Sequence, residues 1–149
     1  MATTYPKYPS GAGWHPIHGL LAAYPIACFT GAFLTDIAYA ETYNMQWANF
    51  SIWLITAGLV MGVLAAVVGI VDFVASKRVR AHRPGWFHSV GNALVLLLSL
   101  WNAFVHSRDA YTSVVPMGII LSGIVTVLVL VTAWIGNSIV YRQQAGGVR

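Results

Sequence analysis

The stretch WANFSIWLITAGLVMGVLAAVVGIVDFVA, residues 47–75, contains a single charged residue, Asp72. A helix needs about 20 mostly apolar residues to cross the ~30 Å hydrocarbon core of a bilayer, and this run exceeds that length. Three further runs also meet the requirement, at about 17–39, 86–105 and 114–140. The sequence therefore predicts an all-α integral membrane protein, with residues 1–149 forming one four-helix up-down bundle.

The composition agrees with a membrane location. The 149 residues are 58% hydrophobic and only 8% charged, whereas a soluble domain carries about a quarter charged residues. The lipid bilayer is thus the expected partner, and the basic residues build no soluble face for nucleic acid. Residues 1–16, rich in proline and glycine, are expected to form an irregular arm. Cys28 is the sole cysteine, which excludes an internal disulfide and c-type haem attachment.

The basic residues predict the orientation of the bundle. With four crossings, both termini and the connection between the second and third runs face the same side. Seven of the eight lysines and arginines lie there, namely Lys7, Lys77, Arg78, Arg80, Arg83, Arg142 and Arg149. Arg108 alone falls on the other side. By the positive-inside rule, both termini are cytoplasmic, and we expect a multi-pass protein of the bacterial inner membrane.

Residue spacing indicates which helix faces meet in the bundle interior. In the second run, small residues recur every three or four positions, which lets backbones approach closely; they are Gly58, Gly62, Ala65 and Gly69, followed by Asp72. The first run carries a comparable face with His18, Ala22, Pro25, Phe29, Ala32 and Asp36. The third carries His88, Asn92, Ser99, Asn102 and His106. We expect these three faces to converge and the largely aliphatic fourth run to act as a scaffold.

Alternating helix directions gather ionisable residues at each end of such a bundle. The cytoplasmic end receives His15, His18, Asp72 and His88, with Asn92 beside them. The outer end receives Asp36, Asn102 and His106, which a plain interhelical hydrogen bond explains. Eighteen residues separate His18 from Asp36, or about 27 Å at 1.5 Å per residue. Ionisable residues in membrane helices are functional candidates by default, so the cytoplasmic cluster is the candidate site.

The same residues carry a family resemblance. His15-Pro16-Ile17-His18 opens the first helix, Gly69-Ile70-Val71-Asp72 closes the second, and His88 with Asn92 opens the third. This combination resembles the prokaryotic membrane domain described as domain of unknown function 2231, over nearly the whole chain. The resemblance implies a four-helix prokaryotic membrane protein. It also implies a redox setting, because some relatives are joined to Rieske or cytochrome c domains, but it implies no settled activity.

Three ligand-binding interpretations of the cytoplasmic cluster remain open. In the first, His18 and His88 ligate a b-type haem from facing helices, and Asp72 accepts a hydrogen bond from a non-ligating ring nitrogen. In the second, His15, His18, His88 and Asp72 hold a non-haem metal such as iron or zinc, which imidazole and carboxylate suit. In the third, a neutral histidine donates to a quinone and the carboxylate handles the proton.

The alternative to all three is a cofactor-free membrane anchor, or a structural subunit of a larger complex. Its polar residues would only cap helices and join them. The sequence contains no His-Glu-x-x-His, Gly-x-Ser-x-Gly or Walker motif, so a stand-alone hydrolase is not indicated. We favour an electron-transfer or cofactor-binding subunit. A redox partner protein or quinone and a homo-oligomer remain open as partners.

Overall fold

The computed structural model describes the backbone of residues 15–75, 84–108 and 110–146, and the side chains of 17–75, 86–108 and 111–138. Four long helices account for most of it: α1 (His15–Thr42), α2 (Met45–Ala75), α4 (Pro84–His106) and α5 (Met117–Gly146). A short 3-10 helix, η1 (Ala110–Ser113), precedes α5. No strand occurs in these ranges, and the prediction of an all-α protein is confirmed.

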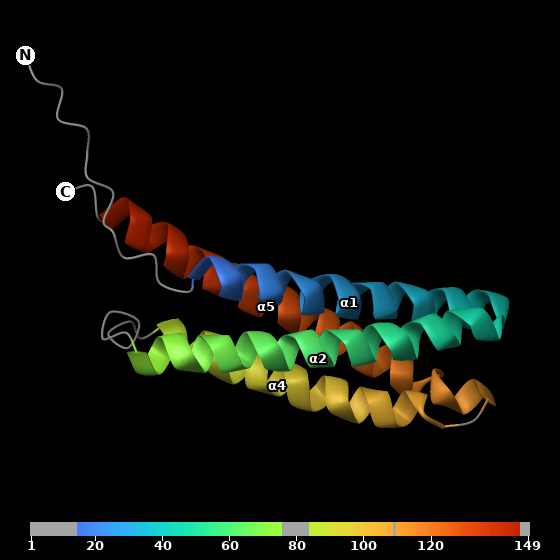
Figure 1. The fold of residues 1–149 in the computed structure, drawn as a ribbon. Helices are drawn as coiled ribbons and strands as arrows, with labels where there is room; N and C mark the ends of the chain where they lie inside the picture. The colour runs from blue at the N-terminus through green and yellow to red at the C-terminus, as the bar shows by residue number, and fades with distance from the viewer. Residues whose placement is uncertain (1–14, 76–83, 109, 147–149) are drawn as a thin grey trace, which may run out of the picture.

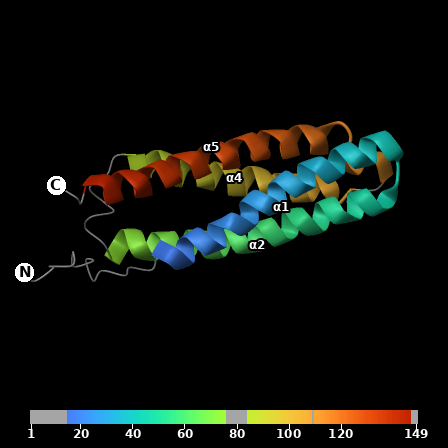
Figure 2. The same cartoon turned by 90° about the horizontal axis from the view of Figure 1, so that it is seen from above.

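The helices run alternately up and down and form one bundle (Figures 1 and 2). Neighbours around the bundle are α1 and α2, α2 and α4, α4 and α5, and α5 and α1. Helix α1 is therefore diagonal to α4, and α2 to α5. We call the end where α1 and α4 begin the inner end and the opposite end the outer end, after the predicted orientation.

The outward surface of the bundle is apolar. Four described segments are long and apolar enough to cross a membrane, namely Ile17–Thr42, Met45–Ala75, Trp86–His106 and Tyr111–Ser138. Large apolar side chains such as Trp53 and Trp134 are strongly exposed, and burying them in hydrocarbon removes that surface from water. The chain is thus a multi-pass membrane protein in contact with the lipid bilayer.

A two-residue connection sets α1 and α2 side by side. Tyr43 adopts a left-handed φ of 55°, and its N–H donates to the Tyr39 carbonyl at 2.8 Å, which closes the last turn of α1. The Asn44 side-chain oxygen accepts from the Gln46 N–H at 3.0 Å, so Asn44 caps the start of α2. Helix α1 consequently runs three residues further than the predicted end at residue 39.

The middle of the bundle is largely apolar, and the described ionisable residues of its interior lie toward its ends. The central cluster consists of Phe29, Val95, Val125 and Val129. Helix α2 approaches it through small residues: Gly58, Gly62 and Ala65 are buried, as their spacing predicted. A Cβ atom at Gly58 would lie 2.6 Å from Cε1 of Phe29, so the close contact between α1 and α2 depends on that glycine.

Candidate functional site

His18 projects from the first turns of α1 onto α2. Its Nδ1 lies 3.0 Å from the carbonyl oxygen of Ala65. Because a carbonyl only accepts hydrogen bonds, Nδ1 carries the proton, and Nε2 is the ring nitrogen with a free lone pair in the neutral imidazole. One turn further along α2, a Cβ atom at Gly69 would lie 3.1 Å from Cε1 of His18. The imidazole therefore packs against a glycine.

His88 repeats this arrangement between α4 and α5. Its Nδ1 lies 2.9 Å from the carbonyl oxygen of Thr132, so this nitrogen also donates. A Cβ atom at Gly136, one turn beyond Thr132, would lie 2.8 Å from Cε1 of His88. Each imidazole is thus held by a backbone carbonyl on the next helix and faces a glycine four residues beyond that carbonyl.

The two imidazoles meet across the bundle. Their ring centroids are 6.3 Å apart, with 75° between the ring planes. Because α1 and α4 are diagonal neighbours, the pair lies across the long axis of the bundle near its inner end. The structure therefore brings together the two histidines that the sequence placed at equal depth.

The other predicted site residues take different positions. The Asn92 amide nitrogen donates to the His88 carbonyl at 2.8 Å and lies 3.2 Å from His88 Nε2, so Asn92 borders the pair. Asp72 is half-buried near the end of α2. His15 is the first residue of α1, but its side chain lies outside the described residues.

The predicted hydrogen bond from a ring N–H of His18 or His88 to the Asp72 carboxylate is not formed. Within the described residues, Asp72 makes no hydrogen bond or ion pair with another side chain or backbone group, whereas Ala65 and Thr132 supply the acceptors for the two histidines. Backbone carbonyls have no sequence signature, which is why the spacing pointed to the carboxylate instead. Among the described side chains, no three His, Cys, Asp or Glu residues form a group that could hold a metal ion.

A second polar cluster lies toward the outer end and is fully enclosed. His106 Nε2 on α4 lies 2.9 Å from Asp36 Oδ1 on α1, and both side chains are buried. The Ser122 hydroxyl on α5 donates to Asp36 Oδ2 at 2.5 Å. The Asn102 side-chain amide donates to Ser122 at 2.8 Å, and the Asn102 backbone carbonyl accepts from His106 Nδ1 at 3.0 Å. We call Asp36, Asn102, His106 and Ser122 the outer cluster.

The outer cluster contains more than the sequence predicted. Asp36, Asn102 and His106 were expected to meet there, but Ser122 belongs to the helix assigned only a scaffolding role. Helix α5 does more than this, because it supplies Ser122 here and the Thr132 carbonyl to His88. The cluster contains serine, histidine and aspartate but is no hydrolytic triad, because Ser122 donates to the carboxylate and not to the imidazole.

The comparisons with known proteins agree with this architecture. The family model of predicted membrane proteins described as DUF2231 matches residues 14–149. The chain belongs to this family. The comparisons with curated proteins and with solved structures gave no match. The family expected from the sequence is thus confirmed for this DUF2231 protein, and its description specifies a membrane protein without an activity.

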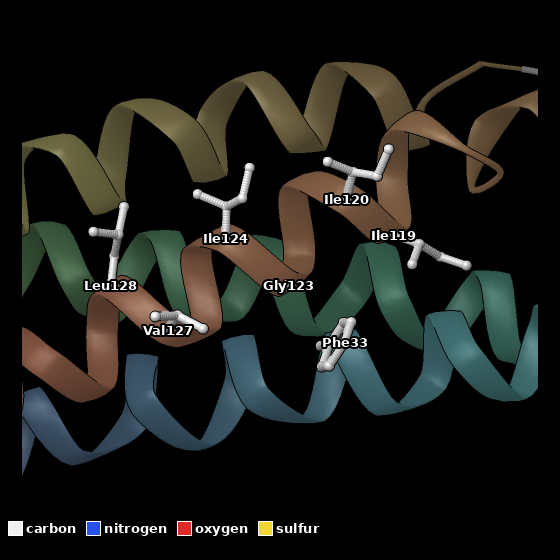
Figure 3. A pocket seen from close by; sticks show the side chains of 7 residues that line it. All are labelled: Phe33, Ile119, Ile120, Gly123, Ile124, Val127 and Leu128. Carbon is white, nitrogen blue, oxygen red and sulfur yellow. The ribbon is translucent and has the colours of Figure 1, made fainter.

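The described part of this DUF2231 protein also has a shallow, open groove of about 510 Å³ on its lipid-facing side. It lies between α1 and α5 and is lined by Phe33, Ile119, Ile120, Gly123, Ile124, Val127 and Leu128 (Figure 3). Its lining contains no polar side chain. Because reaction chemistry needs polar or ionisable groups, the two polar clusters are the candidate sites.

Proposed function

We propose that this DUF2231 protein is a small electron-transfer protein of the bacterial inner membrane. In this proposal it binds one b-type haem between His18 and His88 at its cytoplasmic end. The observation that carries the proposal is the convergence of two imidazoles from diagonal helices, each oriented by a backbone carbonyl.

The protonation pattern suits ligation. Histidine ligands generally donate their second ring N–H to a carbonyl or carboxylate, which fixes the tautomer and the ring direction. Nδ1 of His18 and of His88 each has such an acceptor, in Ala65 and Thr132. The Nε2 lone pairs are therefore the ones that would bind a metal, and at His88 the metal would replace the contact with the Asn92 amide nitrogen at 3.2 Å. The Asn92 amide near His88 Nε2 keeps its hydrogen bond to the His88 carbonyl when that lone pair is used.

The separation of the rings also suits ligation. An imidazole nitrogen binds a metal at about 2 Å, so two imidazoles whose ring centroids lie roughly 6 Å apart could hold one metal ion between them. The centroids of His18 and His88 are 6.3 Å apart. Gly69 and Gly136 leave the space that the two imidazole rings occupy. A Cβ atom at either glycine would enter that space. Two protein ligands suffice for a haem iron, and His18 and His88 would be those ligands.

The position of the pair suggests its partners. A bound haem would supply a one-electron carrier, and the protein would set its potential through hydrogen bonds and burial. His18 lies three residues after the start of α1, close to the predicted cytoplasmic surface. A quinone headgroup or a soluble redox protein can approach that depth. Among the described side chains at this end, those of Asn92 and Asp72 could hydrogen-bond such a headgroup.

The experiment is purification of the full chain in detergent after expression with added haem precursor. We expect an oxidised spectrum with a Soret band that shifts on dithionite reduction, and a stoichiometry of one haem per chain. His18→Ala and His88→Ala should each lose the haem, while His106→Gln, which alters the histidine of the outer cluster, should retain it. Circular dichroism and size-exclusion chromatography identify variants that fail to fold.

A ligand can be distinguished from a structural histidine by chemical rescue. His18→Gly purified with added imidazole should regain the Soret band, because free imidazole can occupy the vacated position. Folded wild-type protein that takes up no haem contradicts the proposal, and so does a folded double variant that retains it. The cofactor-free anchor then becomes the better interpretation, with both histidines only tying α1 to α2 and α4 to α5. Iron or zinc without a Soret band would indicate a non-haem metal.

A further inference from the structure

We propose that the outer cluster is a proton-binding site that holds one proton between Asp36 and His106 inside the membrane-spanning bundle. The site is separate from the histidine pair at the inner end. The apolar cluster around Phe29 and Val95 lies between them. The proposal therefore does not depend on haem binding and can be tested without any cofactor.

The proton count follows from the hydrogen bonds. Nδ1 of His106 must donate, because its partner is the Asn102 carbonyl. The Ser122 oxygen accepts from the Asn102 amide, so its own hydrogen points to Asp36 Oδ2. The remaining contact joins His106 Nε2 to Asp36 Oδ1 at 2.9 Å. Neither of these atoms has a hydrogen in the neutral imidazole and the ionised carboxylate, so the bond requires one additional proton.

This proton makes the pair electrically neutral. Whether it resides on the imidazole or on the carboxyl, Asp36 and His106 together carry no net charge. Without it, a carboxylate would face the lone pair of a neutral imidazole, and a buried negative charge would be left unpaired. The Ser122–Asp36 distance of 2.5 Å lies in the range of charge-assisted O–H···O⁻ bonds. Ser122 thus helps to hold the carboxyl group that shares the proton with His106.

No other described ionisable side chain compensates the pair. On α1, the buried Tyr39 directs its hydroxyl to the sulfur of Met45 at 3.6 Å, and Glu41 is exposed. Arg108 after α4 and Tyr111 in η1 are also exposed. None of these four groups hydrogen-bonds to Asp36 or His106. The described faces of α2 and α5 present hydroxyls, of which Ser122 contacts the carboxylate. The proton shared by Asp36 and His106 therefore balances the negative charge that the pair would otherwise carry.

The test is nitrogen-15 NMR of histidine-labelled full-length protein in bicelles at about pH 8, where a free imidazole is neutral. We expect the additional proton on one member of the pair, so that either both ring nitrogens of His106 are protonated or Asp36 is a carboxylic acid. Asp36→Asn should convert His106 to the neutral tautomer with the hydrogen on Nδ1. Infrared spectra of carbon-13 aspartate-labelled protein detect the form in which the proton lies on Asp36. A protonated Asp36 would show a carboxylic acid band, and Asp36→Asn would remove that band.

Ser122→Ala and Ser51→Ala form a matched pair of buried hydroxyl variants. Ser122→Ala removes a donor to the carboxylate and should shift the His106 signals. Ser51→Ala removes a hydroxyl that lies 2.7 Å from that of Thr35 between α1 and α2, and should leave them unchanged. A wild-type protein with neutral His106 and ionised Asp36 at this pH would overturn the proposal. So would His106 signals that are identical in wild type, Asp36→Asn and Ser122→Ala. The wild-type result decides the matter if Asp36→Asn does not fold.

Discussion

At the scale of single residues, the three histidines with described side chains follow one pattern. Each donates from Nδ1 to a backbone carbonyl and presents its Cε1 edge to a glycine. The carbonyl and the glycine are Ala65 and Gly69 for His18, Thr132 and Gly136 for His88, and Asn102 and Gly118 for His106. Since an imidazole in a membrane helix must hydrogen-bond and also fit between close backbones, each one needs a partner without a Cβ atom.

The glycine beside His88 provides the first test of this pattern. A Cβ atom at Gly136 would lie 2.8 Å from Cε1 and 3.0 Å from Nδ1 of His88, so Gly136→Ala should displace the ring and weaken its bond to Thr132. We expect a loss of about 1–3 kcal/mol in the free energy of unfolding. Gly19→Ala is the control, because nothing lies within 4 Å of a Cβ atom there. Unfolding in mixed micelles with increasing dodecyl sulfate measures the stability of both variants. Equal unfolding midpoints for Gly136→Ala and Gly19→Ala would contradict the expectation.

For the Asp36–His106 pair of the outer cluster, we expect a single substitution to lower the free energy of unfolding more than the double substitution does. His106→Ala leaves Asp36 buried without its partner, which typically costs about 3–5 kcal/mol. Combining it with Asp36→Asn removes the unpaired charge, so the double variant should recover part of that loss. The same micelle unfolding experiment gives the coupling energy through a double-mutant cycle. Additive effects of the two changes would mean that the residues do not interact as the structure has them.

At the scale of helices, the side-chain pattern predicted the faces that converge but not all of the contacts they make. The small-residue stripe of α2 and the faces carrying Asp36 and His106 lie inside the bundle, as their spacing indicated. The contribution of α5 was missed. The carbonyl of Thr132 has no counterpart in the sequence, and the meeting of Ser122 with Asp36 depends on the register between two helices. Periodicity within one helix cannot specify that register.

The contact between α1 and α2 supplies a prediction of its own. A Cβ atom at Gly58 would lie 2.6 and 2.9 Å from the ring of Phe29 and 3.1 Å from Cβ of Cys28. Phe29 is buried in the central cluster, so its ring has little space to retreat. We expect Gly58→Ala to lower the free energy of unfolding by about 1–3 kcal/mol.

Gly31→Ala is the matched control on the facing helix. The nearest atom to a Cβ at Gly31 would be Cδ1 of Leu54 at 3.3 Å. This atom is the end of a flexible side chain and can move away. We therefore expect little change in the midpoint of unfolding. If Gly58→Ala and Gly31→Ala are equally well tolerated, the close approach of α1 and α2 at Gly58 does not limit stability.

At the scale of the whole molecule, an apolar middle separates two polar ends. The central cluster of Phe29, Val95, Val125 and Val129 has the histidine pair on one side and the outer cluster on the other. An unpartnered ionisable group at mid-depth would be costly in hydrocarbon, and the described ionisable groups of both clusters lie nearer to one or the other end of the bundle. Which side each faces then depends on the orientation of the bundle in the membrane.

The distribution of basic residues predicts that orientation, and cysteine labelling can test it. In a Cys28→Ser background, Ser107→Cys places a thiol at the exposed outer end after α4, where the sequence has only Arg108 as a basic residue. Ser76→Cys places one beside the basic segment that includes Lys77 and Arg78. By the positive-inside rule, a membrane-impermeant maleimide should label Ser107→Cys in spheroplasts of intact inner membrane. It should label Ser76→Cys only after the membrane is opened. The reverse pattern would place the histidine pair on the outer side, and electron exchange would then have to involve partners there.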